Sequence, residues 1–191
     1  MSPPGRYAVV IAALVAMSTS GCTNSADSPT AEITVFAAAS LQKTFTQLGQ
    51  QFEAANPGTA VVFNFGGSSD LVAQLQQGAP GDLFASADAA TMDKAVDDAL
   101  ITGEPTVFAT NSMEIAVPPG NPAGIDSFAA LADPDVNVVV CAPQVPCGAA
   151  TQTIEENTGV MLSPVSEENS VTDVLGKVTS GEADAGIVYV T

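Results

Sequence analysis

The sequence contains no histidine and no tryptophan, and only four of its 191 residues are lysine or arginine. Without histidine, a Ser-His-Asp or Cys-His catalytic site cannot be built, and zinc sites that use histidine are excluded. Its three cysteines are too few for an all-thiolate zinc site, which needs four. The acidic residues form no recognisable spaced motif, so the sequence predicts a protein that is not an enzyme.

Positive charge is too scarce for several classes of partner. The 21 acidic residues against 4 basic ones give a formal net charge of -17 at pH 7. Nucleic-acid-binding proteins and proteins that dock on anionic membrane surfaces both rely on clusters of lysine and arginine. The composition therefore excludes nucleic acid as a partner. Hydrophobic residues make up 46% of the chain, which is typical of a globular protein.

Residues 1–21 are predicted to be a signal peptide of the lipoprotein type. A single arginine precedes an apolar run, residues 8–17, which is too short to span a bilayer comfortably. The small residues before Cys22 resemble a bacterial lipoprotein processing site, although Thr19 stands where such sites usually have leucine. Cys22 is then the lipid anchor and residues 22–30 a flexible tether. An ordinary secretory signal that happens to contain a cysteine is the alternative.

The other two cysteines form a pair in the sequence. If Cys22 carries lipid, Cys141 and Cys147 are left together in an exported protein, where an oxidising compartment favours a disulfide between them. A redox or metal-binding pair is the competing interpretation. Their spacing is not that of a CxxC motif, and no histidine is present to complete a metal site.

Strand-like and helix-like segments alternate along the chain. Short apolar runs predict strands, and residues with helical spacing follow most of them. The predicted strands are 32–36, 60–65, 82–86, 113–117, 136–141 and 185–190. This alternation predicts an α/β fold of parallel sheets covered by helices. Because the pattern restarts near residue 106, we expect two lobes on either side of a cleft, lobe I at 31–107 and lobe II at 108–191.

Small or hydroxyl residues recur at the predicted helix starts. They are Ser40, Ser68, Cys147-Gly148 and Ser170-Val171. A helix start has unpaired N–H groups and a partial positive charge, and α/β folds bind ligands at the carboxyl ends of strands. Each serine has an ordinary interpretation as an N-cap, and Tyr189 as a buried strand aromatic. The pattern alone therefore indicates an anion-binding protein of two lobes.

Five motifs, in order, resemble those of the periplasmic molybdate-binding proteins of ABC importers, a family of type II substrate-binding proteins. They are Ile33-Thr-Val-Phe-Ala-Ala-Ala-Ser-Leu41, Phe65-Gly-Gly-Ser-Ser-Asp-Leu71, Gly78-Ala-Pro-Gly-Asp-Leu-Phe-Ala-Ser-Ala-Asp88, Val145-Pro-Cys-Gly148 and Gly186-Ile-Val-Tyr189. The resemblance implies a two-lobe fold of periplasmic-binding-protein type with a central cleft. It also implies that the cleft holds molybdate or tungstate by hydrogen bonds, with no cofactor and no cation partner.

Carried over residue by residue, the resemblance selects five ion-binding positions. They are the side chains of Ser40, Ser68 and Tyr189 and the backbone amides of Cys147 and Val171. Ser69 is the neighbour that a slip of one residue would choose instead of Ser68. Cys147 stands where the family often has alanine, but the backbone amide is still available.

The resemblance also implies partners and a location. The protein is expected to be a monomer, anchored by lipid at the outer face of the cytoplasmic membrane or in the periplasm. Its lobes close on the ion by a hinge near residues 106–110 and deliver the ion to the membrane subunits of an ABC permease. Rival functions are binding of sulfate, phosphate or a small organic anion and, from another class, a carboxylate-based secreted enzyme or a sensor domain.

One departure from the family concerns length. Family members continue beyond the strand that ends at Tyr189, with a helix and a segment that completes the first lobe. The sequence ends at Thr191, so we expect about a quarter of the two-lobe fold to be absent. The expected consequences are exposed apolar surface on the first lobe and weak binding.

Overall fold

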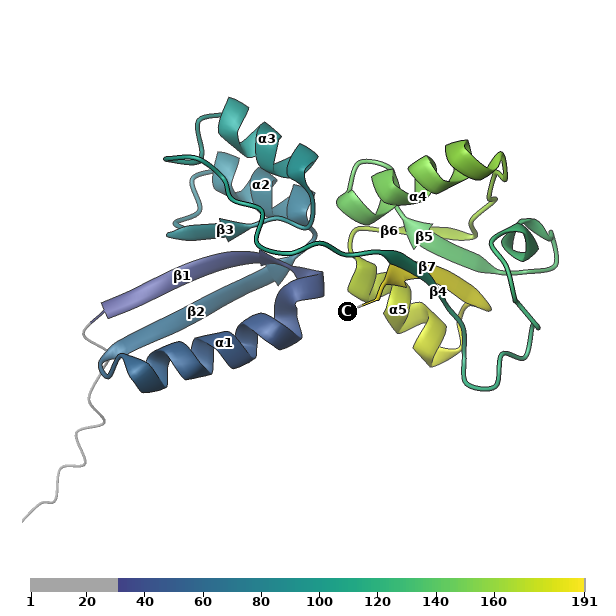
Figure 1. Ribbon diagram of the computed structural model, residues 1–191, viewed down its shortest axis with the longest axis horizontal. Helices are drawn as coiled ribbons and strands as arrows, with labels where there is room; N and C mark the ends of the chain where they lie inside the picture. The colour runs from purple at the N-terminus through teal and green to yellow at the C-terminus, as the bar shows by residue number, and fades with distance from the viewer. Residues whose placement is uncertain (1–30, 191) are drawn as a thin grey trace, which may run out of the picture.

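The computed structural model describes residues 31–190, and it forms two α/β lobes that lie side by side (Figure 1). The first lobe is built on a three-stranded sheet of order β2-β1-β3, and the second on a four-stranded sheet of order β4-β7-β5-β6. The predicted signal peptide, Cys22 and the tether lie outside the described residues. The α/β class and the two-lobe architecture predicted from the sequence are confirmed. The exact boundary at residues 107 and 108 stays a prediction.

The first lobe contains seven elements. They are β1 (Ala31–Ala38), η1 (Ala39–Leu41), α1 (Gln42–Ala55), β2 (Thr59–Gly66), α2 (Ser68–Gln76), β3 (Leu83–Ala85) and α3 (Ala89–Asp97). β1 pairs in parallel with β2 along its whole length and with β3 on its other edge. Side chains alternate across a strand, so Val35 and Ala37 pack with Ala85 in one cluster, which Phe45 of α1 also contacts. α1 covers one face of this sheet, and α2 and α3 lie on the other (Figure 1).

The second lobe also contains seven elements. They are β4 (Met113–Ala116), η2 (Ala129–Ala132), β5 (Val138–Cys141), α4 (Pro146–Thr158), β6 (Ser166–Glu168), α5 (Val171–Ser180) and β7 (Ala185–Tyr189). β5 is buried on both faces: Val139 and Cys141 pack with α5, whereas Val138 and Val140 pack in the cluster around Leu131 of η2. Both sheets therefore present the carboxyl ends of parallel strands to the loops that precede α2, α4 and α5.

Two features of the second sheet differ from the sequence prediction. β4 runs antiparallel to β7, with Met113 opposite Tyr189, so the sheet is mixed where parallel strands were expected. β6 was not predicted, because Ser166-Glu167-Glu168 has no apolar pattern. It forms by pairing in parallel with β5, which places Ser166 opposite Val139.

Large apolar side chains are exposed on the first lobe and on the connection that follows it. Leu48 and Phe52 of α1 are 51% and 44% exposed, and Phe108 in the connection between the lobes is 59% exposed. Phe108 contacts the ring of Phe45, with 5.8 Å between the ring centroids. The connection between α3 and β4 therefore packs against α1 before it enters the second lobe.

Candidate functional site

A small cavity of about 20 Å³ lies where the two lobes meet. Its lining residues are Ala38, Ala39, Ser40, Gly66, Gly67, Ser68 and Ala87 from the first lobe and Pro146, Cys147, Asn169, Ser170, Val171 and Tyr189 from the second. All five ion-binding positions predicted from the sequence are among them. No described residue that lines the cavity carries a charged side chain.

Three helices begin at this cavity. α2 begins at Ser68, α4 at Pro146 and α5 at Val171. The first N–H groups of a helix have no partner within the helix, and the helix dipole adds a partial positive charge there. Three helix starts around one hollow create a field that favours an anion, with no lysine or arginine in the lining.

The Ser68 hydroxyl is held in place by the backbone. The residue is 2% exposed, and its Oγ accepts a hydrogen bond from Ala87 N–H at 3.0 Å. A hydroxyl also has one proton to donate. Within the described residues 31–190 this proton has no protein acceptor, so Ser68 can donate to a guest in the cavity.

The N-cap interpretation of the serines is correct at only one of three positions. Ser170 caps α5 by accepting from Asp173 N–H at 3.2 Å, and its hydroxyl also donates to Asp173 Oδ2 at 2.6 Å. Ser68 is the first residue of α2, after the N-cap Gly67, and Ser40 lies in η1, two residues before α1 begins. Ser40 and Ser68 therefore do not cap a helix, and the Ser40 hydroxyl has no hydrogen bond within the described residues.

Cys141 and Cys147 form a disulfide across the loop between β5 and α4. Cys147 is the second residue of α4, so its N–H has no acceptor within the helix. The next residue, Gly148, lies against the same loop, since a Cβ there would stand 1.9 Å from Ala142 O. The disulfide and this close backbone approach fix the start of α4, and with it the Cys147 amide, against β5.

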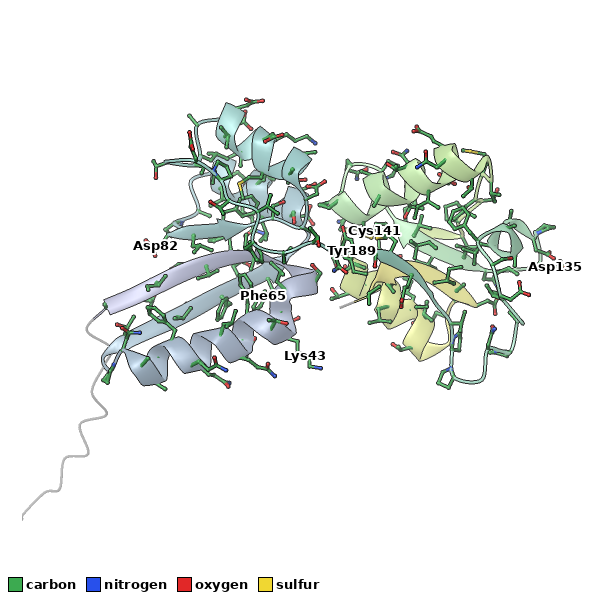
Figure 2. All side chains as sticks on the ribbon, in the orientation of Figure 1. Lys43, Phe65, Asp82, Asp135, Cys141 and Tyr189 are labelled. Atoms are coloured by element: carbon green, nitrogen blue, oxygen red, sulfur yellow. A yellow bond between two sulfur atoms is a disulfide. The ribbon has the colours of Figure 1, made fainter. Side chains whose placement is uncertain are left out.

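Tyr189 ends β7 at the edge of the second lobe that faces the first (Figure 2). Burial raises the pKa of its hydroxyl to about 12, and the Asp88 carboxylate adds to the effect. The phenol is therefore fully protonated at neutral pH and can serve as a hydrogen-bond donor.

A spectrophotometric titration of Tyr189 tests its burial. We expect the phenolate to appear with a midpoint near pH 12 in the folded chain and near pH 10 in denaturant. Since the folded state holds this proton more tightly, stability is unaffected below pH 10 and falls as the pH rises from 10 to 12. The difference spectrum against Tyr189→Phe isolates this residue from Tyr7, and circular dichroism reports whether the chain is still folded. A midpoint near 10 in the folded chain contradicts the burial.

A second, larger hollow adjoins the cavity. This open groove of about 630 Å³ runs between α1 and α5 and shares Ala39, Ser40, Val171 and Tyr189 with the cavity. Lys43 lines it and projects from the start of α1 (Figure 2). The groove gives solvent access to one wall of the cavity and places a cation along that approach.

The residues predicted from the sequence make up part of the cavity lining and its support. Sequence reasoning missed Asn169 and the amide of Ala87, which holds Ser68. Asn169 directly precedes the predicted helix start at Ser170-Val171, so its place in the chain was a usable signal. Ala87 carried no signal, because a backbone amide has no sequence signature.

Two kinds of feature are absent from the described residues. Residues 31–190 contain no group of three or more histidine, cysteine, aspartate or glutamate side chains placed to hold a metal ion. In that same part of the chain, every helix is too short or too polar to cross a bilayer.

Comparison with known proteins identifies relatives that are solute-binding proteins. Residues 33–191 match the family described as bacterial extracellular solute-binding protein. The molybdate-binding protein ModA of Mycobacterium tuberculosis (strain ATCC 25618 / H37Rv) is 56% identical over 187 residues, which cover 96% of this chain and 72% of that protein. ModA of Escherichia coli (strain K12) is 35% identical over 168 residues, covering 83% of this chain and 65% of that protein.

A solved structure is similar as well. The periplasmic molybdate-binding protein of Azotobacter vinelandii superposes with a TM-score of 0.69 at 25% identity, covering 82% of this chain and 71% of that one. The sulfate-binding protein SubI of Mycobacterium tuberculosis H37Rv shares the fold, with a TM-score of 0.65 at 22% identity over 83% of this chain and 64% of that one.

Proposed function

Because the chain belongs to the bacterial extracellular solute-binding proteins, we propose that it captures molybdate in the cavity between its lobes and supplies it to an ABC permease. One observation carries the choice of ligand. The cavity lining contains the hydroxyls of Ser40, Ser68 and Tyr189 and the helix-start amides of Cys147 and Val171, and no described lining residue is charged. A small oxyanion fits such a lining, and the relatives named for molybdate binding reach 56% identity. These relatives are named as binding proteins, in agreement with the predicted absence of enzyme activity.

The size of the cavity supports a small guest. Sites for drug-sized ligands measure roughly 300–1,000 Å³, and a single water needs about 10–15 Å³. With the lobes placed as they are, the cavity of about 20 Å³ has room for one to two water-sized guests, so it supports a guest far smaller than a sugar or a peptide.

The five proposed donors are the hydroxyls of Ser40, Ser68 and Tyr189 and the amides of Cys147 and Val171. Charge-assisted hydrogen bonds contribute about 1.5–3 kcal/mol each, and closing the lobes removes water that weakens them. Five such bonds offset the costs of association, so the ion can be held by hydrogen bonds alone. The connection that includes residues 106–110 is the proposed hinge.

Ion size provides the selectivity in this proposal. Tungstate has the same shape as molybdate and is expected to bind, whereas the smaller sulfate leaves donors unpaired. Sulfate is the second candidate, since the fold is shared with a sulfate-binding protein. We further propose lipid anchoring through Cys22 at the outer face of the cytoplasmic membrane and action as a monomer.

Thermal unfolding with different oxyanions tests the function. At an ion concentration of 100 times the Kd, stability rises by about 2.7 kcal/mol, which corresponds to roughly 5–10 °C in Tm. We expect this rise with molybdate and tungstate, and under 1 °C with sulfate and phosphate. A rise with sulfate alone would reassign the ligand. A cooperative transition that none of the four ions moves would contradict an oxyanion site.

A further inference from the structure

Two contacts join the lobes beside the cavity. The Ser69 hydroxyl donates to the backbone oxygen of Gln144 at 2.8 Å, across 75 positions in the sequence. Gly67 lies against the backbone of Asn169, so closely that a Cβ on Gly67 would stand 2.1 Å from Asn169 O. Ser69 and Gln144 do not line the cavity, and Gly67 offers no side chain to a ligand. The contact of Ser69 with Gln144 therefore acts between the lobes and not on the guest, and the contact of Gly67 with Asn169 joins the lobes through the backbone at the cavity wall.

The first-lobe side of these contacts is rigid. Gly67 and Ser69 flank Ser68, whose Oγ is fixed by Ala87 N–H at 3.0 Å. The same turn is anchored by Leu71, which is fully buried and whose N–H donates to Gly67 O at 3.0 Å. The positions of Gly67 and Ser69 consequently follow the first lobe as a unit.

The second-lobe side is rigid as well. Gln144 lies in the loop after β5, and Asn169 follows β6. Ala142 N–H donates to Glu168 O at 2.9 Å, which ties the two loops together, and the Cys141–Cys147 disulfide closes the first of them. The backbone oxygens of Gln144 and Asn169, which contact the first lobe, are therefore held together by this hydrogen bond and the disulfide.

We propose that Gly67 and Ser69, with the backbone oxygens of Gln144 and Asn169, form a closure latch that sets how long the ion is held. The proposal rests on the proposed function. Ser68 lies between the two first-lobe members of the latch, and Gln144 and Asn169 precede Cys147 and Val171 by three and two residues. Closing the latch therefore brings the donors of the two lobes together. Ser69 is a positioning residue, which affects the ion only through the position of the lobes, and Gly67 at the cavity wall positions the lobes through its contact with Asn169.

Three variants separate the latch from the ion contacts. Ser69→Ala removes the hydrogen bond to Gln144, and Ser69→Thr keeps a hydroxyl. Gly67→Ala adds a methyl group that clashes with Asn169 only while the lobes touch. Gly67 has φ -60° and ψ 133°, which any residue adopts, so this change does not strain the first lobe itself. Ser127→Ala is the control, since Ser127 bonds only within its own turn, to Ala130 N–H.

Molybdate dissociation rates of the full chain are measured by stopped-flow tyrosine fluorescence, with thermal unfolding of each ligand-free variant to confirm that it folds. Loss of one exposed neutral hydrogen bond predicts about two- to twelvefold faster dissociation for Ser69→Ala, since such a bond is worth about 0.5–1.5 kcal/mol. We expect Ser69→Thr to restore the wild-type rate, and association to change less than twofold. We expect at least tenfold faster dissociation for Gly67→Ala and no change for Ser127→Ala. Wild-type dissociation in both Ser69→Ala and Gly67→Ala would overturn the latch and leave the proposed function intact.

Small-angle X-ray scattering without any ion tests the latch separately from the proposed function. We expect a larger radius of gyration for Gly67→Ala than for the wild type, because the added methyl group holds the lobes apart. Equal radii would overturn the latch. If the wild-type chain binds no oxyanion, the proposed function fails, and the scattering comparison still decides whether the latch exists.

Discussion

Gly148→Ala is expected to lower the free energy of unfolding by about 3 kcal/mol, at the upper end of the cost of overpacking a tightly packed site. The added Cβ would stand 1.9 Å from Ala142 O and 2.7 Å from Cys141 O. Both neighbours are backbone atoms, and the disulfide holds their loop, so no flexible side chain can move aside. The start of α4 must shift, and the Cys147 amide shifts with it.

The matched control is Gly176→Ala. Gly176 lies in the interior of α5, is exposed, and has nothing within 4 Å of an added Cβ. Alanine is favoured over glycine in a helix, so this variant should gain about 0.5–1 kcal/mol. The same chemical change is thus expected to have opposite signs at the two positions. Thermal or urea unfolding measures both, and a Gly148→Ala variant as stable as the wild type would show that the backbones are not in close contact.

Ser68→Ala is expected to weaken molybdate binding about 10- to 100-fold. The variant loses one charge-assisted hydrogen bond, worth roughly 1.5–3 kcal/mol, and every 1.4 kcal/mol is a factor of ten in Kd. It also leaves the Ala87 N–H without its partner, so the stability of the ligand-free chain should fall by about 1–3 kcal/mol. Isothermal titration calorimetry and thermal unfolding give the two quantities separately.

Ser170→Ala is the comparison that separates binding from stability. Ser170 also lines the cavity, but its hydroxyl is already bonded to Thr172 and Asp173. Removing this N-cap should lower stability by about 1 kcal/mol and change the affinity by less than about threefold. Equal losses of affinity in the two variants would mean that Ser68 acts through the fold and not as a donor.

Much of the fold could be predicted because its signals are local. The apolar run before Ser40 predicted β1, and Ser170-Val171 was predicted as a helix start, where α5 begins. β6 and the direction of β4 could not be predicted, since both are decided by pairing with distant strands. The local sequence pattern describes one strand at a time and carries no information about which distant strand it will pair with.

The candidate site likewise combines features that local sequence signals predict with features that depend on distant contacts. Its five predicted residues were selected by helix starts and by family motifs, and the structure gathers them in one cavity. The interpretation of Ser40 and Ser68 as N-caps was wrong. Capping depends on the residue at which the backbone enters the helix, and the residue type alone does not determine that position. The bond between Ser69 and Gln144 joins two loops from different lobes, and neither loop has a pattern that points to the other.

The lining of the cavity has a consequence for how cargo leaves. Tyr189 is the only lining side chain among the described residues that titrates, and it holds its proton to about pH 12. An acidic or mildly alkaline surrounding therefore changes neither the number of donors nor their charge. For a cargo held in this way, acidity is no release signal. Under the proposed function, release of the ion then depends on separation of the two lobes and not on a change of pH.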